Sequence, residues 1–268
     1  MSSVDAQMGT WAGFFSRDEL AEEVKKIPEF ECVNVFTAKE DLFTHQSKFK
    51  AIVEKDHDEA ISVVSDRYAL VQTRDVFSLV LSYLKEDILG EIFYDRGRAL
   101  LHVFLKDSDI GICVMNSVDR SSAINVFFIK KVNGTTVYLP PAYTGKISGY
   151  KRLHVGVPLN EVTNFSEILL DAPQAWGIIV EQLSKTPLTT DIVQEIKEVL
   201  GTKTLVELVD QFGNSNLGRF TGNRPSLWDL LLVVLKAASA SKFKTPVHRE
   251  KRLRELSTLL IALALKMS

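Results

Sequence analysis

ISVVSDRYALVQTRDVFSLVLSYL, residues 61–84, is the stretch that decides the fold. The spacing of its apolar residues changes along the stretch from that of a strand to that of a helix. Its first residues, Ile61 to Val64, are mainly β-branched and predict a strand. From Thr73, a candidate N-cap, apolar residues recur every three or four positions and predict a helix to about Leu84. The helix has one apolar face, and we expect that face to pack on a β-sheet.

The pattern of the residues after this helix predicts the strands of that sheet. Leu89-Gly90 has the composition of a helix end, so we expect the first strand from Glu91. Asn133-Gly134 is the strongest hairpin signal in the chain. Further strands are expected at residues 91–95, 99–105, 110–115, 123–129 and 136–139, with turns at 95–98 and 107–109.

The two ends of the chain have different patterns. Upstream, a short helix at residues 17–26 and a strand at 32–36 are expected. From about residue 160 the pattern is helical, with helices at residues 161–170, 173–183, 190–200, 203–212, 227–236 and 247–266. The predicted fold is α+β, an antiparallel sheet packed on a long helix and followed by an all-helical C-terminal region. Its three parts are residues 1–56, 57–159 and 160–268.

The composition indicates a folded protein without a membrane segment. Hydrophobic residues make up 46% of the 268 residues, which is enough to build a core. The longest apolar runs, 230–235 and 259–265, are far shorter than the ~20 residues that span a bilayer. The two cysteines, Cys32 and Cys113, have no disulfide or metal spacing. We therefore expect a soluble cytoplasmic protein with no membrane partner.

No sequence motif of a catalytic class occurs, so we expect no enzyme activity, no cofactor and no metal site. The five histidines share no ligand spacing, and His102, in an apolar strand, is expected to be a hydrogen-bonded core residue. Aspartates cluster at residues 56–58 and 107–109, in turns where aspartate commonly bonds the local backbone. A metal site assembled from these clusters without a motif stays open.

The charge pattern is the strongest functional signal. The net charge is only −2, yet no acidic residue occurs between Arg120 and Asn160 in a chain with 34 of them. Cations for phosphates beside aromatic rings for bases are typical of proteins that bind single-stranded nucleic acid. The candidate nucleic-acid-binding residues are Arg120, Lys130, Lys131, Tyr143, Lys146, Tyr150, Lys151 and Arg152. The alternative is a solvated edge hairpin whose lysines prevent aggregation.

A second group of basic residues lies near the C-terminus, at the start of the last predicted helix. It comprises Lys242, Lys244, Arg249, Lys251, Arg252 and Arg254, diluted by Glu250 and Glu255. The leucines that follow form a wide apolar stripe. This pattern is typical of a core or subunit-packing helix with a solvated first turn, and it suggests a homo-oligomer.

Five segments between about residues 60 and 243 form a pattern, at residues 62–77, 97–98, 116–126, 185–196 and 226–237. Among them are SVVSDRYALVQTRDVF and KTPLTTDIVQEI. Together these segments resemble the phage/plasmid-like protein family, a domain of unknown function found on bacteriophages, plasmids and other mobile elements. Family members often have Asp-Gly where this chain has Asp119-Arg120, and Cys-x-Asn where it has Tyr138-Leu139-Pro140. The resemblance implies the biology of mobile elements, with nucleic acid nearby.

Two functions follow as expectations. The first is a non-catalytic DNA-binding protein of a virus or plasmid that engages single-stranded DNA, with strand annealing or recombination as its role. The alternative is an oligomeric structural or host-interaction protein with no nucleic-acid role. In the first case Lys130 and Lys131 lie on an exposed side of the sheet, where reversing their charge has little effect on stability.

Overall fold

The computed structural model describes residues 14–39, 42–55, 57, 59–119, 124–139, 151–152, 165–200, 203, 205–210 and 225–267. The centre of this part of the chain is a seven-stranded antiparallel sheet. Its order is β1-β5-β6-β7-β8-β10, and β9 also pairs with β8. The strands are β1 (Phe15–Ser16), β5 (Ile88–Asp95), β6 (Arg98–Leu105), β7 (Ile110–Ser117), β8 (Ile124–Val132), β9 (Thr135–Leu139) and β10 (Lys151–Arg152).

Two tight turns confirm the predicted hairpins of this sheet. Arg96 and Gly97, between β5 and β6, have φ values of 42° and 82°. Asn133 and Gly134, between β8 and β9, have φ values of 50° and 78°. Two consecutive residues with positive φ give a turn whose twist matches that of the paired strands, and glycine adopts this conformation without strain.

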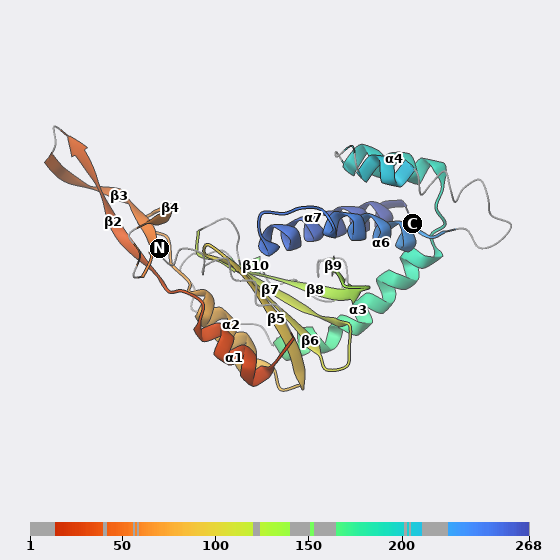
Figure 1. Ribbon diagram of the computed structural model, residues 1–268, viewed down its shortest axis with the longest axis horizontal. Coiled ribbons are helices and arrows are strands. Elements are labelled where there is room, and N and C mark those ends of the chain that lie inside the picture. Colours follow the sequence, from red (N-terminus) through yellow and green to blue (C-terminus); the bar gives the residue numbers. More distant parts are fainter. Residues whose placement is uncertain are drawn as a thin grey trace, which may run out of the picture.

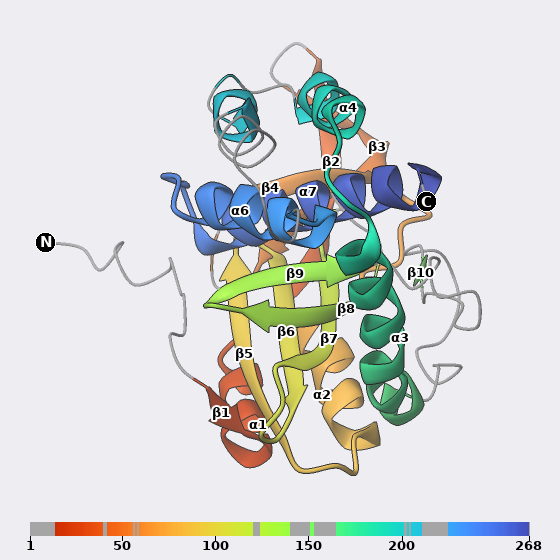
Figure 2. The ribbon, with the colours of Figure 1, turned by 90° about the vertical axis from the view of Figure 1, so that its right-hand side faces the viewer.

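Helices cover both faces of the sheet (Figures 1 and 2). Helices α1 (Arg17–Lys25), α2 (Thr73–Tyr83) and α3 (Phe165–Lys185) contact one face, where the side chain of Asn116 on β7 donates to the Thr73 hydroxyl at 3.0 Å. Helices α6 (Leu227–Ser239) and α7 (Pro246–Met267) lie across the other face. The α+β class with an antiparallel sheet is confirmed.

A second, three-stranded antiparallel sheet projects from this body (Figure 1). It contains β2 (Phe30–Lys39), β3 (Leu42–Glu54) and β4 (Ala60–Ser65). The strand predicted ahead of α2 is β4, so it belongs to this sheet and not to the one that α2 covers. The expected division at residue 56 falls between β3 and β4, which pair with each other.

Two predictions about helix ends were wrong. Leu89 and Gly90 lie inside β5, since α2 already ends at Tyr83. Gly90 is needed for close approach: a Cβ there would lie 2.5 Å from the His102 carbonyl oxygen and 2.7 Å from Leu20 Cδ1. The N-cap of α2 is Gln72, and Thr73 is its first helical residue.

The helices predicted at residues 161–170 and 173–183 form one helix, α3, which continues through Pro173. Proline removes a backbone hydrogen bond and costs a helix about 3 kcal/mol. Leu169, Ala172 and Trp176 around it are buried in the core, and this packing holds the helix together. Helix α4 (Thr190–Leu200) has the predicted bounds, and Ser226 is the N-cap of α6. Among the described helices, none is long and apolar enough to cross a bilayer.

Candidate functional site

A cavity of about 90 Å³ lies between β6, β7 and α7, and every charged side chain that lines it is a cation. These cations are Arg98 on β6, and Lys251 and Arg254 on α7. Arg98 Nε donates to Asp119 Oδ2 at 2.8 Å, which offsets one of the three positive charges. We call this site the basic cavity. It carries an excess of positive charge.

The other two cations have no carboxylate partner among the described residues. Arg254 Nη1 lies 2.5 Å from Met115 Sδ, and its guanidinium carbon lies 5.4 Å from the centroid of the Phe127 ring. Contacts with a thioether and an aromatic face orient the guanidinium without neutralising it. Lys251 is exposed. Both charges remain available to an anion.

One of the two basic segments, the start of α7, lines the basic cavity, and the described part of the other lies across the sheet from it. Met115, which lines the cavity, pairs with Asn125 of β8, and Asn125 pairs with Lys151 of β10. Arg254 of α7 lies over the Phe127 ring of β8, the strand with which β10 pairs. The basic start of α7 therefore reaches the strand that carries the described part of the acid-free stretch.

The structure describes four of the eight predicted nucleic-acid-binding residues. Lys151 and Arg152 form β10, which pairs with the first two residues of β8. β9 pairs with residues 128–132 of β8, so the described parts of the acid-free stretch come together. The other four residues, Arg120, Tyr143, Lys146 and Tyr150, lie outside the described residues.

Lys130 and Lys131 are tied into ion pairs. Lys130 Nζ lies 2.5 Å from Asp109 Oδ2, and Lys131 Nζ lies 2.7 Å from Glu91 Oε1. Their side chains are 19% and 23% exposed. The expectation that both lie on an exposed side of the sheet was wrong, because carboxylates on β5 and on the turn before β7 pack against them.

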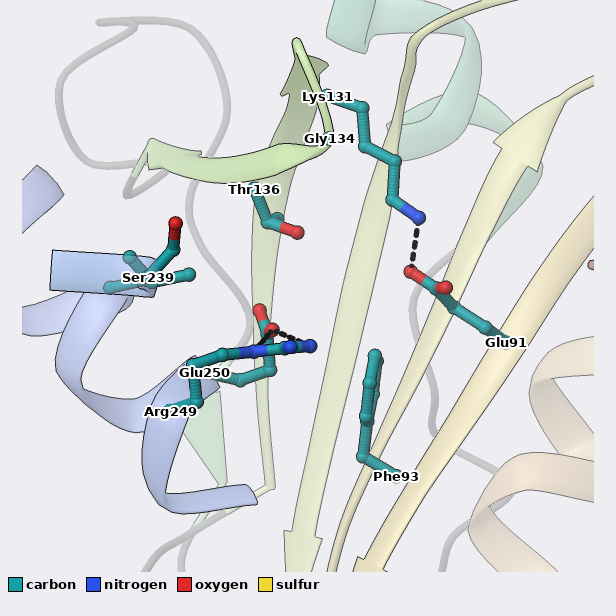
Figure 3. Close-up of a pocket in the computed structure, with 9 residues that line it drawn as sticks. Glu91, Phe93, Lys131, Gly134, Thr136, Ser239, Arg249 and Glu250 are labelled. Atoms are coloured by element: carbon teal, nitrogen blue, oxygen red, sulfur yellow. Dashed lines mark hydrogen bonds and ion pairs between the residues drawn. The ribbon is translucent and has the colours of Figure 1, made fainter. Parts of the chain in front are cut away.

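Lys131 borders a second, polar cavity of about 110 Å³ under α7, which we call the polar cavity (Figure 3). In Figure 3 its ammonium group meets Glu91 on one side, and Arg249 lies against Glu250 on the other. Both cations here have carboxylate partners. The charges that line the polar cavity therefore balance, unlike those of the basic cavity.

A chain of buried hydrogen bonds connects the two carboxylates of the polar cavity. His102 Nδ1 lies 3.2 Å from Glu91 Oε1, and His102 Nε2 lies 3.0 Å from the Tyr138 hydroxyl. The Tyr138 hydroxyl donates to Glu250 Oε2 at 2.7 Å. His102 is fully buried and hydrogen-bonded, as the sequence predicted. These hydrogen bonds connect β5, β6 and β9 to α7. Each of the buried polar groups depends on its neighbour as a hydrogen-bond partner.

The charged groups linked by these hydrogen bonds stabilise one another. Burial raises the pKa of Glu91, but the His102 hydrogen bond and the Lys131 ammonium outweigh it and lower that pKa to about 2. Burial lowers the pKa of His102, but Cys113 and Glu91 outweigh it and raise that pKa to about 10. We therefore predict that His102 is an imidazolium at neutral pH and donates both to Glu91 and to Tyr138.

This assignment predicts that stability falls with rising pH. A histidine with a pKa near 6.5 in the unfolded chain and about 10 in the folded chain contributes fully below pH 6.5, and loses that contribution as pH rises towards 10. We expect the free energy of unfolding, measured with urea, to decrease steadily from pH 6.5 to pH 9. His102→Gln should flatten this decrease, whereas His57→Gln, at an exposed histidine, should keep it.

A pH-independent free energy of unfolding in the wild type over that range would show that His102 is neutral.

The aspartate clusters do not form a metal site in the part of the chain that the structure describes. Asp109 pairs with Lys130, and Asp107 lies in a turn with a φ of 60°. Asp56 and Asp58 lie outside the described residues. Within the described ranges no group of three histidine, cysteine or carboxylate side chains could hold a metal ion.

No family model, no curated protein and no solved structure matches the chain. The resemblance to the phage/plasmid-like protein family therefore stays a prediction that rests on the quoted segments.

Proposed function

We propose that this protein binds single-stranded nucleic acid, with phosphates seated at the basic cavity and along the neighbouring edge of β8 and β10. The observation that carries the proposal is the pair of cations, Lys251 and Arg254, without carboxylate partners among the described residues. Arginine and lysine that neutralise phosphates provide most of the affinity in sequence-independent binding. The acid-free stretch supports the same surface from the adjacent strands.

Strand annealing or recombination on a mobile element is the role we propose for this binding. The support is the resemblance to the phage/plasmid-like protein family. DNA is the proposed natural ligand, because such elements replicate and recombine as DNA. The proposal needs no catalytic group, and phosphate binding by itself performs no chemistry.

The salt dependence of binding provides the test. Lys251, Arg254, Lys151 and Arg152 offer three to four phosphate contacts, and each contact on a single strand contributes a slope of about −0.7. We expect the logarithm of the association constant to fall with the logarithm of salt concentration at a slope of about −2 to −3. Fluorescence anisotropy with a labelled oligonucleotide of mixed sequence measures it.

Absence of binding at low salt, or binding that salt does not weaken, would refute the proposal. A duplex of the same sequence is the control for the strand preference. Tighter binding to the duplex would contradict a surface for single strands.

The apolar helices of the C-terminal region do not favour the alternative of an oligomeric interaction protein. Leu230, Leu231 and Leu235 on α6 are buried within the chain, as are Leu256 and Leu260 on α7. These side chains pack on the sheet and on neighbouring helices, so the wide apolar stripe needs no second subunit.

A further inference from the structure

The polar cavity under α7 is lined by two ion pairs that lie on opposite sides of it (Figure 3). On one side Lys131 Nζ lies 2.7 Å from Glu91 Oε1, and on the other Arg249 Nη2 lies 3.0 Å from Glu250 Oε1. The first pair comes from β8 and β5, and the second belongs to α7. Charges of both signs therefore line one cavity.

Each pair has hydrogen-bonding capacity left for a ligand. His102 and Lys131 both contact Oε1 of Glu91, which leaves Oε2 of this carboxylate as an acceptor. Arg249 contacts Glu250 through Nε and Nη2, so the N–H groups of Nη1 remain as donors. The cavity thus offers an acceptor on the β5 side and donors on the α7 side.

A buried hydroxyl also points into this cavity. Thr136 on β9 is 4% exposed, and Figure 3 shows its hydroxyl directed at the space between the two ion pairs. The hydroxyl forms no hydrogen bond to any residue in the described part of the chain. Buried polar groups in proteins are nearly always hydrogen-bonded, so this hydroxyl indicates a partner that the described residues do not supply.

The size of the cavity limits the ligand to a small molecule. The cavity volume is about 110 Å³, whereas a single water needs about 10–15 Å³ of such a volume. There is room for about seven to eleven water-sized groups, which is more than one bridging water fills. Gly134 lies on the rim, where an added Cβ would meet no atom within 4 Å, so the rim is open at this point.

The charges of the lining favour a ligand that itself carries both signs. A simple anion would meet the carboxylates of Glu91 and Glu250, and a simple cation would meet Lys131 and Arg249. Either one is repelled by half of the charged lining, and an unpaired charge is unfavourable at a partly buried site. A zwitterion can place its cationic group at Glu91 and its anionic group at Arg249.

We propose that the polar cavity binds a small zwitterion, a free α-amino acid with a short side chain. Its ammonium group donates to Oε2 of Glu91, and its carboxylate accepts hydrogen bonds from Arg249 and from the Thr136 hydroxyl. Charge-assisted hydrogen bonds of this kind are about twice as strong as neutral ones. This site is independent of the proposed nucleic-acid binding, which uses other residues.

Isothermal titration calorimetry tests the proposal with glycine, L-alanine and L-serine as probes. We expect at least one of them to bind the wild type at one site with a dissociation constant of about 1 mM or tighter. Propionate and ethylamine are the controls, since each carries only one of the two charged groups. Both should bind at least about 10-fold more weakly, because each meets like charges in the cavity.

Two variants locate the site. Thr136→Val removes the hydroxyl, keeps the shape of the side chain and breaks no hydrogen bond in the described part of the chain. We expect it to bind the amino acid about 10-fold more weakly, and Thr136→Ser to retain most of the affinity. Arg249→Gln should also weaken binding by about 10-fold or more. Its control is Arg252→Gln, at 34% exposure against 39% for Arg249, on the same helix and outside the cavity lining.

Three results would overturn the proposal. If none of the three amino acids binds, the cavity is a solvated part of the core. If propionate or ethylamine binds as tightly as the amino acid, the cavity selects a single charge and not a zwitterion. If an amino acid binds but Thr136→Val and Arg249→Gln leave its affinity unchanged, it binds elsewhere on the protein. None of these results affects the oligonucleotide measurements, which test the proposed function separately.

Discussion

Replacing Lys251 and Arg254 together by glutamate is expected to abolish binding of single-stranded oligonucleotides at physiological salt. Two cations without carboxylate partners become two anions beside Arg98, so the charge that attracts phosphates is reversed. Losing two phosphate contacts alone makes the salt dependence of binding shallower, by about 1.4 in a slope of about −2 to −3. Repulsion between the new carboxylates and the phosphates weakens binding further. We expect a fall in affinity of more than 100-fold, measured by anisotropy.

The matched control is Lys185→Glu/Lys203→Glu, which makes the same change in net charge. Both lysines are exposed, at 74% and 90%, and neither lines the basic cavity. Each forms only a surface ion pair, which contributes at most about 1 kcal/mol to stability. Equal losses of binding in the two variants would show that overall charge, and not the basic cavity, controls the affinity.

The cavity lysine and arginine are better targets than Lys130 and Lys131, which the sequence pattern suggested. Lys131→Glu would place a carboxylate beside Glu91 and next to the buried His102. A loss of binding in that variant would then be hard to separate from a loss of folding. Arg254 is only partly buried, and Lys251 is exposed, so circular dichroism can verify the fold of the double variant.

Much of the fold could be predicted from the sequence because the signals are local. The Asn133-Gly134 turn needs two residues with positive φ, and few other residue pairs allow this conformation. The capping box of α6 is formed by Ser226 and Asp229, three residues apart. Such features depend on neighbours in the chain, so they are visible without a structure.

The errors come from contacts over long distances in the sequence. Gly90 is a glycine because a Cβ there would meet the His102 carbonyl oxygen on β6 and the Leu20 side chain on α1, about 70 residues upstream. Pro173 does not end α3, because the residues around it are buried in the core and their packing stabilises the helix. In each case tertiary packing outweighs the local preference of the residue.

The candidate site could be predicted only in part. The acid-free stretch and the basic start of the last helix are both visible as charge patterns, but only the start of the helix contributes residues to the basic cavity. Arg98 contributes a third cation from a strand whose sequence gives no sign of a site.

Replacing Glu91 by leucine should cause the largest loss of stability, about 3 kcal/mol or more. The change leaves two cationic groups, His102 and Lys131, without the carboxylate that both of them contact. Removing one partner of a buried ion pair typically costs 3–5 kcal/mol, because the remaining charge stays uncompensated. Urea denaturation at pH 6, where His102 is charged, measures the change. Glu22→Leu, at an exposed pair, is the control and should cost at most about 1 kcal/mol.

A double-mutant cycle separates the ion pair from the packing of the leucine. If the cost arises from the uncompensated imidazolium, Glu91→Leu/His102→Leu should be less destabilised than the sum of the single variants by about 1 kcal/mol or more. Glu91 is also one of the groups that raise the pKa of His102, so Glu91→Leu should reduce the alkaline loss of stability between pH 6.5 and pH 9. Additive single effects together with an unchanged pH profile would contradict a charged His102, because a neutral imidazole needs no carboxylate to hold its proton.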